Sequence, residues 1–150
     1  MKPLNGIKVI DLTHMLAGPY AGMVIADLGA EVVKIEPLVT GEMTRGLLKT
    51  DPNYSYKEFG AYFLTLNRNK KSVSLDLKSE IGLEIFYQLV KSADVVLNNF
   101  SAGVVKKLKI DFETLNTINP KIITCSITGF GETGPHSSRP AYDQIVQAYS

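Results

Sequence analysis

The sequence predicts an α/β protein built on a Rossmann-like parallel sheet flanked by helices. Short β-rich runs alternate with helical patterns along most of the 150 residues, which is typical of a parallel sheet wrapped by helices. Strands are predicted at residues 7–11 and 31–36, and the apolar segment between them opens at Gly18-Pro19 and stops at Gly29. This order is a βαβ unit. An apolar content of 45% is enough for a buried core.

The elements of the first half follow from local composition. The helix expected over residues 20–28 carries a single charge, Asp27, so we expect it to be buried on most sides. Residues 37–60 contain proline, glycine and asparagine without a clear period, and are predicted to form a long excursion away from the sheet. Excursions of this length usually serve function or are covered by a partner.

The second half continues the alternation. Residues 61–66 are a short apolar segment, and the alternating residues 72–76 predict a strand. Ser79 is a suitable N-cap for a helix with an apolar stripe at three- and four-residue spacing. The stripe consists of Ile81, Ile85, Phe86, Leu89 and Val90. The remaining predictions are a strand at 94–97, helices at 104–108 and 112–118, a strand at 121–127 and a helix at 141–150.

This fold class indicates where function should be sought. In open parallel sheets, ligands bind beyond the carboxyl ends of the strands. The segments that follow the predicted strands are residues 13–19, Pro37 onward, 76–78, 98–103 and 129–139. We expect them to meet in one crevice.

Composition excludes several classes of function. Sixteen basic and fifteen acidic residues give a net charge of +1, and no aromatic residues interleave with basic ones, so no nucleic-acid partner is expected. Cys125 lies in an apolar run, which predicts a buried structural thiol in a reducing compartment. No stretch resembles a signal peptide or a membrane span. We therefore expect a soluble, cytoplasmic protein with no membrane partner.

A glycine motif at residues 129–134 matches the dinucleotide-binding fingerprint GxGxxG and follows a predicted strand. The fingerprint requires a helix directly after it, but the chain continues as a loop from Pro135 to Pro140. Glu36, which could mimic the ribose-binding acid, stands upstream of the glycines. The sequence therefore predicts no NAD, and the glycines are expected to permit a mobile loop.

Other polar residues leave two interpretations open. His14 follows a strand, where histidines are more often structural than catalytic, and His136 has no cysteine or second histidine at metal-ligand spacing, so no metal is expected. Asn98 and Asn99 suit either a turn or contacts to amides and phosphates. Two basic clusters are either solvated or face the phosphates of a nucleotide-like ligand. They are Arg68, Lys70 and Lys71, and Lys106, Lys107 and Lys109.

Taken together, these segments resemble the class III CoA-transferase family, also called the CaiB/BaiF type, which includes formyl-CoA and carnitine-CoA transferases. The resemblance covers nearly the whole chain in order. The matching segments are residues 4–11, 17–19, 26–36, 67–72, 75–78, 93–95 with 99–100, 126–134, 139–143 and 147–148.

The resemblance implies a Rossmann-like large domain, an interlocked homodimer of the full-length parent, and acyl-CoA and carboxylic acid as substrates. Residues 1–150 would be the amino-terminal, CoA-binding part of that domain, with its remainder and a small domain outside this chain. The resemblance also assigns contacts with coenzyme A to fifteen residues of this chain. These are Leu16, Ala17, Leu75, Asp76, Leu77, Lys78, Asn99, Phe100, Ser101, Lys107, Arg139, Pro140, Ala141, Tyr142 and Asp143.

The family moves CoA through an aspartate nucleophile that forms an anhydride and then an aspartyl-CoA thioester. By the family pattern this aspartate falls beyond Ser150, so no catalytic residue is expected in this chain and the 150 residues alone should be inactive. Asp143 matches a binding position instead. The alternatives are an acyl-CoA racemase or isomerase of the same superfamily and a non-catalytic CoA- or nucleotide-binding module.

Three positions depart from related branches. Formyl-CoA transferases carry glutamine where Leu16 stands and arginine where Pro37 stands, which argues against formate or oxalate and removes one nucleotide contact. The racemase branch has an acid/base histidine where this chain has Tyr142. The resemblance therefore favours CoA transfer over racemisation.

Overall fold

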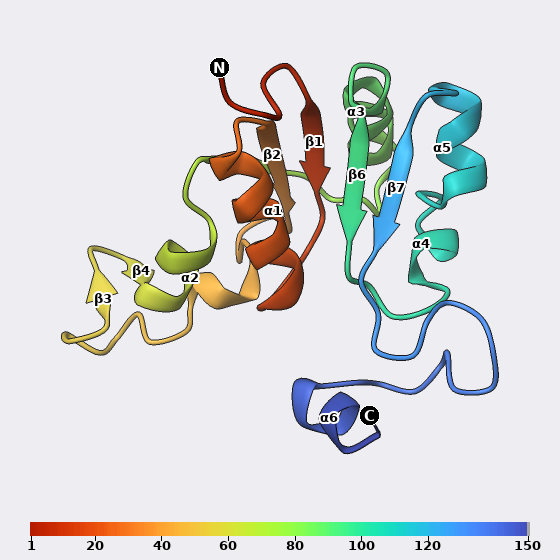
Figure 1. Ribbon diagram of the computed structural model, residues 1–150. Helices are drawn as coiled ribbons and strands as arrows, with labels where there is room; N and C mark the ends of the chain where they lie inside the picture. The colour runs from red at the N-terminus through yellow and green to blue at the C-terminus, as the bar shows by residue number, and fades with distance from the viewer. Residues whose placement is uncertain (150) are drawn as a thin grey trace.

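A five-stranded parallel sheet in the order β5-β2-β1-β6-β7 forms the centre of the molecule, as a computed structural model describes it for residues 1–149 (Figure 1). Its strands are β1 (Lys8–Asp11), β2 (Glu31–Glu36), β5 (Lys70–Ser74), β6 (Val95–Asn98) and β7 (Ile123–Ser126). All four pairings are parallel. The predicted α/β fold class is confirmed.

Helices and one hairpin connect these strands. The helices are α1 (Ala17–Asp27), α2 (Ala61–Leu66), α3 (Glu80–Val90), α4 (Val104–Lys107), α5 (Phe112–Ile118) and α6 (Asp143–Tyr149). The excursion after β2 contains a 3-10 turn, η1 (Met43–Arg45), and a two-stranded antiparallel hairpin of β3 (Ser55–Tyr56) and β4 (Phe59–Gly60). Figure 1 shows α6 lying apart from the sheet at the end of a long loop. Ser150, the last residue of the helix predicted there, lies outside the described residues.

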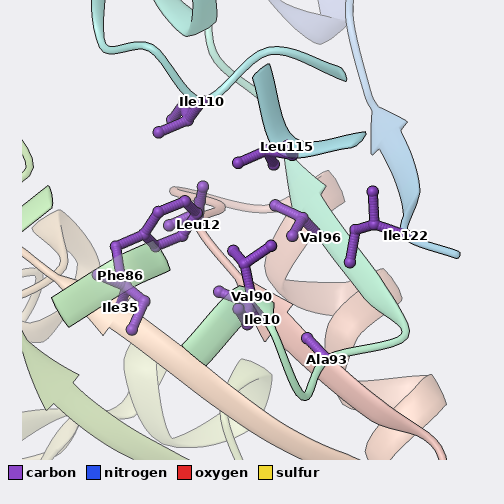
Figure 2. Close-up of a cluster of buried hydrophobic side chains, with 10 residues drawn as sticks. All are labelled: Ile10, Leu12, Ile35, Phe86, Val90, Ala93, Val96, Ile110, Leu115 and Ile122. Carbon is purple, nitrogen blue, oxygen red and sulfur yellow. The ribbon is translucent and has the colours of Figure 1, made fainter. Parts of the chain in front are cut away.

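Alternate residues of the strands pack on opposite faces of the sheet. In β1, Val9 packs with Ala26 of α1, whereas Ile10 belongs to a larger core formed with α3 and α5. Figure 2 shows this larger core, in which Phe86 and Val90 of α3 are fully buried. Its buried members are Ile10, Leu12, Ile35, Phe86, Val90, Ala93, Val96, Ile110, Leu115 and Ile122.

The third strand of the sheet in chain order, β5, differs from its prediction by two residues. It spans Lys70–Ser74 rather than 72–76, because its register against β2 pairs Val32 with Lys70 and Glu36 with Ser74. The sequence alternation continues past the last paired residue, so the pattern by itself does not mark where pairing stops. Ser79 caps α3 as predicted, accepting a hydrogen bond from the Gly82 N–H at 3.0 Å.

The first helix is buried on one side only, which corrects the expectation of burial on most sides. Gly18, Gly22 and Ala26 face the sheet, but Tyr20 and Val24 are exposed. The segment after α2 contacts α1 at Asp27, through Arg68 and Asn69. A similar correction applies to α3, where Ile81 of the predicted stripe is 74% exposed and Ile85 43%. The buried face of α3 runs through Gly82 instead.

Cys125 is exposed, so the prediction of a buried structural thiol is wrong. Leu97 of β6 pairs with Cys125, and paired residues of neighbouring strands point to the same face. Leu97 is covered from the α1 side, but β7 is the outermost strand and no described element covers this face of it. Ile123, two residues earlier on β7, is 60% exposed for the same reason.

An ion pair between partly buried Arg45 and buried Glu36 anchors the excursion to the end of β2. The Arg45 guanidinium donates from Nε and Nη2 to the two carboxylate oxygens of Glu36, at 2.5 and 2.6 Å. Glu36 is 1% exposed and also accepts a hydrogen bond from Ser72 Oγ at 2.6 Å. Burial alone would raise the pKa of Glu36, but these hydrogen bonds and the Glu42 N–H lower it to about 2. The folded state therefore holds Glu36 as a carboxylate.

Arg45→Met would leave the buried Glu36 carboxylate without its cation, and we expect it to lower the free energy of unfolding by about 3 kcal/mol. The matched control is Lys71→Met, which breaks the exposed 2.7 Å pair of Lys71 with Glu31 and should cost about 1 kcal/mol or less. Urea unfolding at pH 7 followed by circular dichroism measures both. Equal losses in the two variants would contradict the anchoring role.

The same pair predicts a pH dependence. Because the pKa of folded Glu36 is lowered from 4.5 to about 2, its contribution to stability is present above pH 4.5 and is lost as the pH falls from 4.5 toward 2. Urea unfolding across this window should show a smaller loss for Arg45→Met than for the wild type. A wild-type stability that is flat over the window, or identical slopes, would refute this assignment.

The exposed position of Cys125 predicts that its thiol reacts with Ellman's reagent in the folded chain, without denaturant. Exposure is the main requirement for access by the reagent. The absorbance of the released thiolate measures the reaction, and a chain unfolded in guanidinium provides the full signal. A thiol that reacts only after unfolding would restore the buried assignment.

Candidate functional site

Two neighbouring cavities lie beyond the carboxyl ends of the strands and share one wall residue, Phe100. The first has a volume of about 440 Å³ and the second about 430 Å³. The segments that follow β1 and β6 contribute to both cavities. Those after β2 and β5 line the first, and the one after β7 lines the second. The expected meeting of strand-end segments is therefore found, as two cavities rather than one crevice.

The first cavity is lined mainly by apolar side chains. Leu12 and Ile35 at the strand ends are buried, and Phe100 and Leu108 complete the apolar lining. Of the residues assigned to CoA by resemblance, it contains Leu75, Asp76, Leu77, Lys78 and Phe100. Lys78 is exposed at the cavity, so an apolar ring system could bind there with an anionic group near the lysine.

The second cavity is bounded by the start of α1, the loop after β6 and the loop that leads to α6. It contains ten of the assigned residues, Leu16, Ala17, Asn99, Phe100, Ser101, Arg139, Pro140, Ala141, Tyr142 and Asp143. Lys107 lines neither cavity. It is exposed on α4, one residue before Leu108 of the first cavity.

Side chains from three segments hold the loop between β1 and α1 by its backbone. The N–H of Thr13 donates to Asp11 Oδ1 at 2.8 Å. The N–H of His14 donates to Asn99 Oδ1 at 2.8 Å, and the N–H of Met15 donates to Glu42 Oε1 at 2.9 Å. Three successive amides thus have side-chain acceptors, and the loop that opens the second cavity is fixed in place.

The two asparagines at the end of β6, Asn98 and Asn99, form internal hydrogen bonds. Asn99 accepts from the His14 N–H and donates its Nδ2 to the His14 carbonyl at 2.7 Å. Asn98 donates to Ser126 Oγ at 3.0 Å and accepts from the Phe100 N–H. Of the two interpretations left open by the sequence, loop formation accounts for both amide groups in this structure.

The basic cluster before β5 is also used internally. Lys70 Nζ lies 2.8 Å from Asp11 Oδ2 and donates to the Pro19 carbonyl and to Asn67. Burial lowers the pKa of Lys70, and the Asp11 carboxylate opposes that shift. Arg68 and Lys71 pair with carboxylates on α1 and β2. None of the three lines either cavity, so this cluster does not face a ligand there.

His14 lies at the first cavity, half-buried, with its ring centroid 5.8 Å from that of Phe100. Burial and the nearby Lys34 ammonium lower its pKa, against the opposing carboxylates of Glu42 and Asp11. The imidazole is therefore neutral at pH 7 and can donate or accept one hydrogen bond at the cavity wall.

Two parts of the site are not among the individual residues that the sequence analysis assigned. Ile127 and Phe130 help to line the second cavity, and their place directly after β7 was the available signal. Glu42 was missed altogether, because a single acid in an excursion without periodicity carries no sign that it folds back onto the loop after β1. Its carboxylate is fully buried there.

The glycines at 129–134 lie in a loop, and the next helix, α6, begins only at Asp143. The helix start that a dinucleotide fingerprint needs after its glycines is therefore missing from this segment, as the sequence predicts. Glu36 is held by Arg45 rather than directed to a ribose. Among residues 1–149, no cluster of three or more histidines, cysteines or acids is placed to hold a metal ion, and no helix is long and apolar enough to cross a membrane.

Comparisons with known proteins agree with this geometry. A family model described as CoA-transferase family III matches residues 4–150. The succinate–glutarate CoA-transferase of Agrobacterium fabrum is 44% identical, over 99% of this chain and 38% of that protein. The human succinyl-CoA:glutarate CoA-transferase is 42% identical, over 100% of this chain and 33% of that protein.

Solved structures show the same similarity in three dimensions. A CaiB/BaiF family protein from Brucella suis superposes with a TM-score of 0.90 at 43% identity, covering 99% of this chain and 39% of that one. A protein of Mycobacterium tuberculosis in an orthorhombic crystal form gives a TM-score of 0.89 at 42% identity, covering 99% and 40%. The chain thus spans less than half the length of these relatives. Its sequence and fold show that it belongs to CoA-transferase family III.

Proposed function

We propose that this chain provides the coenzyme-A-binding part of an enzyme that moves CoA from an acyl-CoA thioester to a carboxylic acid. One observation carries the proposal. Every residue that the resemblance assigns to CoA, except Lys107, lines one of the two cavities at the carboxyl edge of the sheet. These residues come from segments far apart in the sequence, and the fold brings them together.

In this proposal the two ends of CoA occupy different cavities. The nucleotide end binds in the first cavity, whose apolar lining suits a flat ring and whose Lys78, with Lys107 nearby, suits phosphate groups. The pantetheine arm crosses Phe100, which lines both cavities, and enters the second. No side chain caps α1 at Leu16, so the first-turn amides beside the second cavity are available to an oxygen of the arm.

The transfer itself requires a carboxylate nucleophile. In the proposed reaction an aspartate attacks the thioester carbonyl and CoA leaves as a thiolate, giving an acyl anhydride. The thiolate then attacks the aspartyl carbonyl, which releases the first carboxylate and leaves an aspartyl-CoA thioester for the acceptor acid. Among the described residues, Asp143 is the one carboxylate that lines the second cavity. It accepts a hydrogen bond from Gln147 Nε2 at 2.7 Å. By the family pattern, we propose that the nucleophile lies beyond residue 150.

The names of the relatives support a proposal for the substrates. Their names refer to succinate, glutarate and oxalate, so we propose a small carboxylic acid as acceptor. Tyr142 is 73% exposed at the second cavity, where the racemase branch has its histidine. This chain has no histidine at that position, which favours transfer over racemisation. A cytoplasmic homodimer is proposed for the longer protein, and the exposed apolar side chains of α1 and β7 support a covered surface there.

Lys78→Glu should weaken CoA binding about tenfold, because a carboxylate would replace the cation beside the first cavity. The matched control is Lys121→Glu, which makes the same change at an exposed residue outside both cavities. Isothermal titration of CoA into the 150-residue chain measures the dissociation constant, with NAD as the comparison ligand. A folded chain that ignores CoA or prefers NAD would overturn the proposed cofactor.

The isolated chain should not transfer CoA, since its second cavity is proposed to lack the nucleophile. Incubation with succinyl-CoA and glutarate, followed by chromatography of the acyl-CoA products, should give no glutaryl-CoA above the rate without protein. Formation of glutaryl-CoA that disappears in Asp143→Asn would show instead that Asp143 is the nucleophile.

A further inference from the structure

One buried carboxylate joins the excursion after β2 to the loop that opens the second cavity. Glu42 is 0% exposed and caps η1, where its Oε2 accepts hydrogen bonds from the backbone N–H and the hydroxyl of Thr44. Its other oxygen, Oε1, accepts the N–H of Met15 at 2.9 Å. The Glu42 side chain thus links the two segments by hydrogen bonds.

The position of this carboxylate is itself fixed. The backbone N–H of Glu42 donates to Glu36 Oε2 at 2.8 Å, and the same oxygen of Glu36 lies 2.5 Å from Arg45 Nε. Glu42 is therefore tied to the end of β2 by its main chain while its side chain extends to the loop after β1. Rigid support of this kind is what allows one side chain to define the geometry of another segment.

Met15 adopts a conformation that its own chemistry disfavours. Its φ angle is 66°, in the left-handed region that residues with a Cβ seldom occupy. Met15 is 38% exposed and belongs to neither buried apolar cluster of the core. The Met15 N–H donates to Glu42 Oε1, and this hydrogen bond to another segment favours the turn.

The turn at Met15 determines how α1 begins. Leu16 and Ala17 follow directly and line the second cavity, and α1 starts at Ala17 without a side-chain cap. The first-turn amides of a helix have no acceptor within it. Their direction relative to the cavity depends on the conformation of the residue before Leu16, and hence on what holds Met15.

We propose that Glu42 is a positioning residue, whose carboxylate holds the left-handed turn at Met15 and so directs Leu16, Ala17 and the first amides of α1 to the ligand arm in the second cavity. This inference rests on the proposed CoA site, because that site supplies the ligand. Glu42 itself lines neither cavity. Glu42 therefore affects binding indirectly. Its loss should weaken the binding of the pantetheine arm of CoA and not that of the nucleotide.

The first test needs no ligand. Amide hydrogen exchange by NMR compares the wild type with Glu42→Ala and with Val90→Ala, a core truncation on the α3 side of the sheet. Removing the acceptor should lower the protection of the Met15 amide by about 10- to 100-fold. In Val90→Ala that protection should fall no more than that of Val96, which reports global opening. Unchanged Met15 protection in Glu42→Ala would overturn the inference.

The second test separates the two ends of the ligand. Titrations measure the dissociation constants of CoA and of adenosine 3′,5′-bisphosphate, which lacks the pantetheine arm. Glu42→Ala should weaken CoA about tenfold and the bisphosphate less than about twofold. Glu42→Gln keeps one acceptor oxygen for the Met15 N–H and should bind CoA better than Glu42→Ala. Val90→Ala should leave the ratio of the two constants unchanged.

The outcomes distinguish the inference from the function on which it rests. Equal weakening of both ligands in Glu42→Ala, or the same pattern in Val90→Ala, would show a merely structural role and overturn the positioning proposal. Tight CoA binding by both wild type and Glu42→Ala would overturn it while leaving the CoA site intact. A folded wild type that binds neither ligand would overturn both.

Discussion

The carboxyl edge of the sheet depends on the buried ion pairs that the Asp11 carboxylate forms with Lys70 and Lys34. Asp11 ends β1, it is fully buried, and it lies 2.8 Å from Lys70 of β5 and 3.9 Å from Lys34 of β2. Lys34 in turn donates to the Thr13 carbonyl at 2.7 Å. A Cβ on Gly22 would come within 2.7 Å of an Asp11 oxygen, so only glycine lets α1 pass this close. Buried charges persist only when paired and hydrogen-bonded, and here the pairing joins three strands to the loop after β1.

A second polar cluster extends this control to the excursion after β2. The Glu36–Arg45 pair fixes the start of the excursion. The Glu42 N–H donates to Glu36, and the Glu42 carboxylate accepts the N–H of Met15. The loop after β1, which contributes residues to both cavities, is thereby held by hydrogen bonds to other segments. Such an arrangement preorganises a binding site, because the loop does not have to be ordered when the ligand arrives. It also explains why an otherwise irregular segment of the chain contains some of its most buried side chains.

The division of the edge into two cavities has a direct meaning for a long ligand. Phe100 lies between one cavity near β2 and β5 and a second cavity near α1 and the loop before α6. A ligand with a ring system at one end and a flexible arm at the other can occupy both in one extended conformation. The face of β7 with Ile123 and Cys125, together with Tyr20 on α1, is left open by the described residues. In the longer proteins of the family, more than half of the chain is available to cover such surfaces.

The sequence by itself determined the fold class, the order of most elements and the strand-end segments where ligand contacts gather, because alternation and turn residues are local signals. The resemblance added the particular residues, most of which the fold brings to the two cavities. Only the tertiary structure decided which apolar residues are buried, since Ile81 and Cys125 have apolar neighbours in sequence but no covering layer in space. It also decided that Asn99 and Lys70 form internal bonds, and that Glu42 reaches Met15. A hydrogen bond between segments that are distant in sequence has no local pattern, so it becomes visible only when the chain is folded.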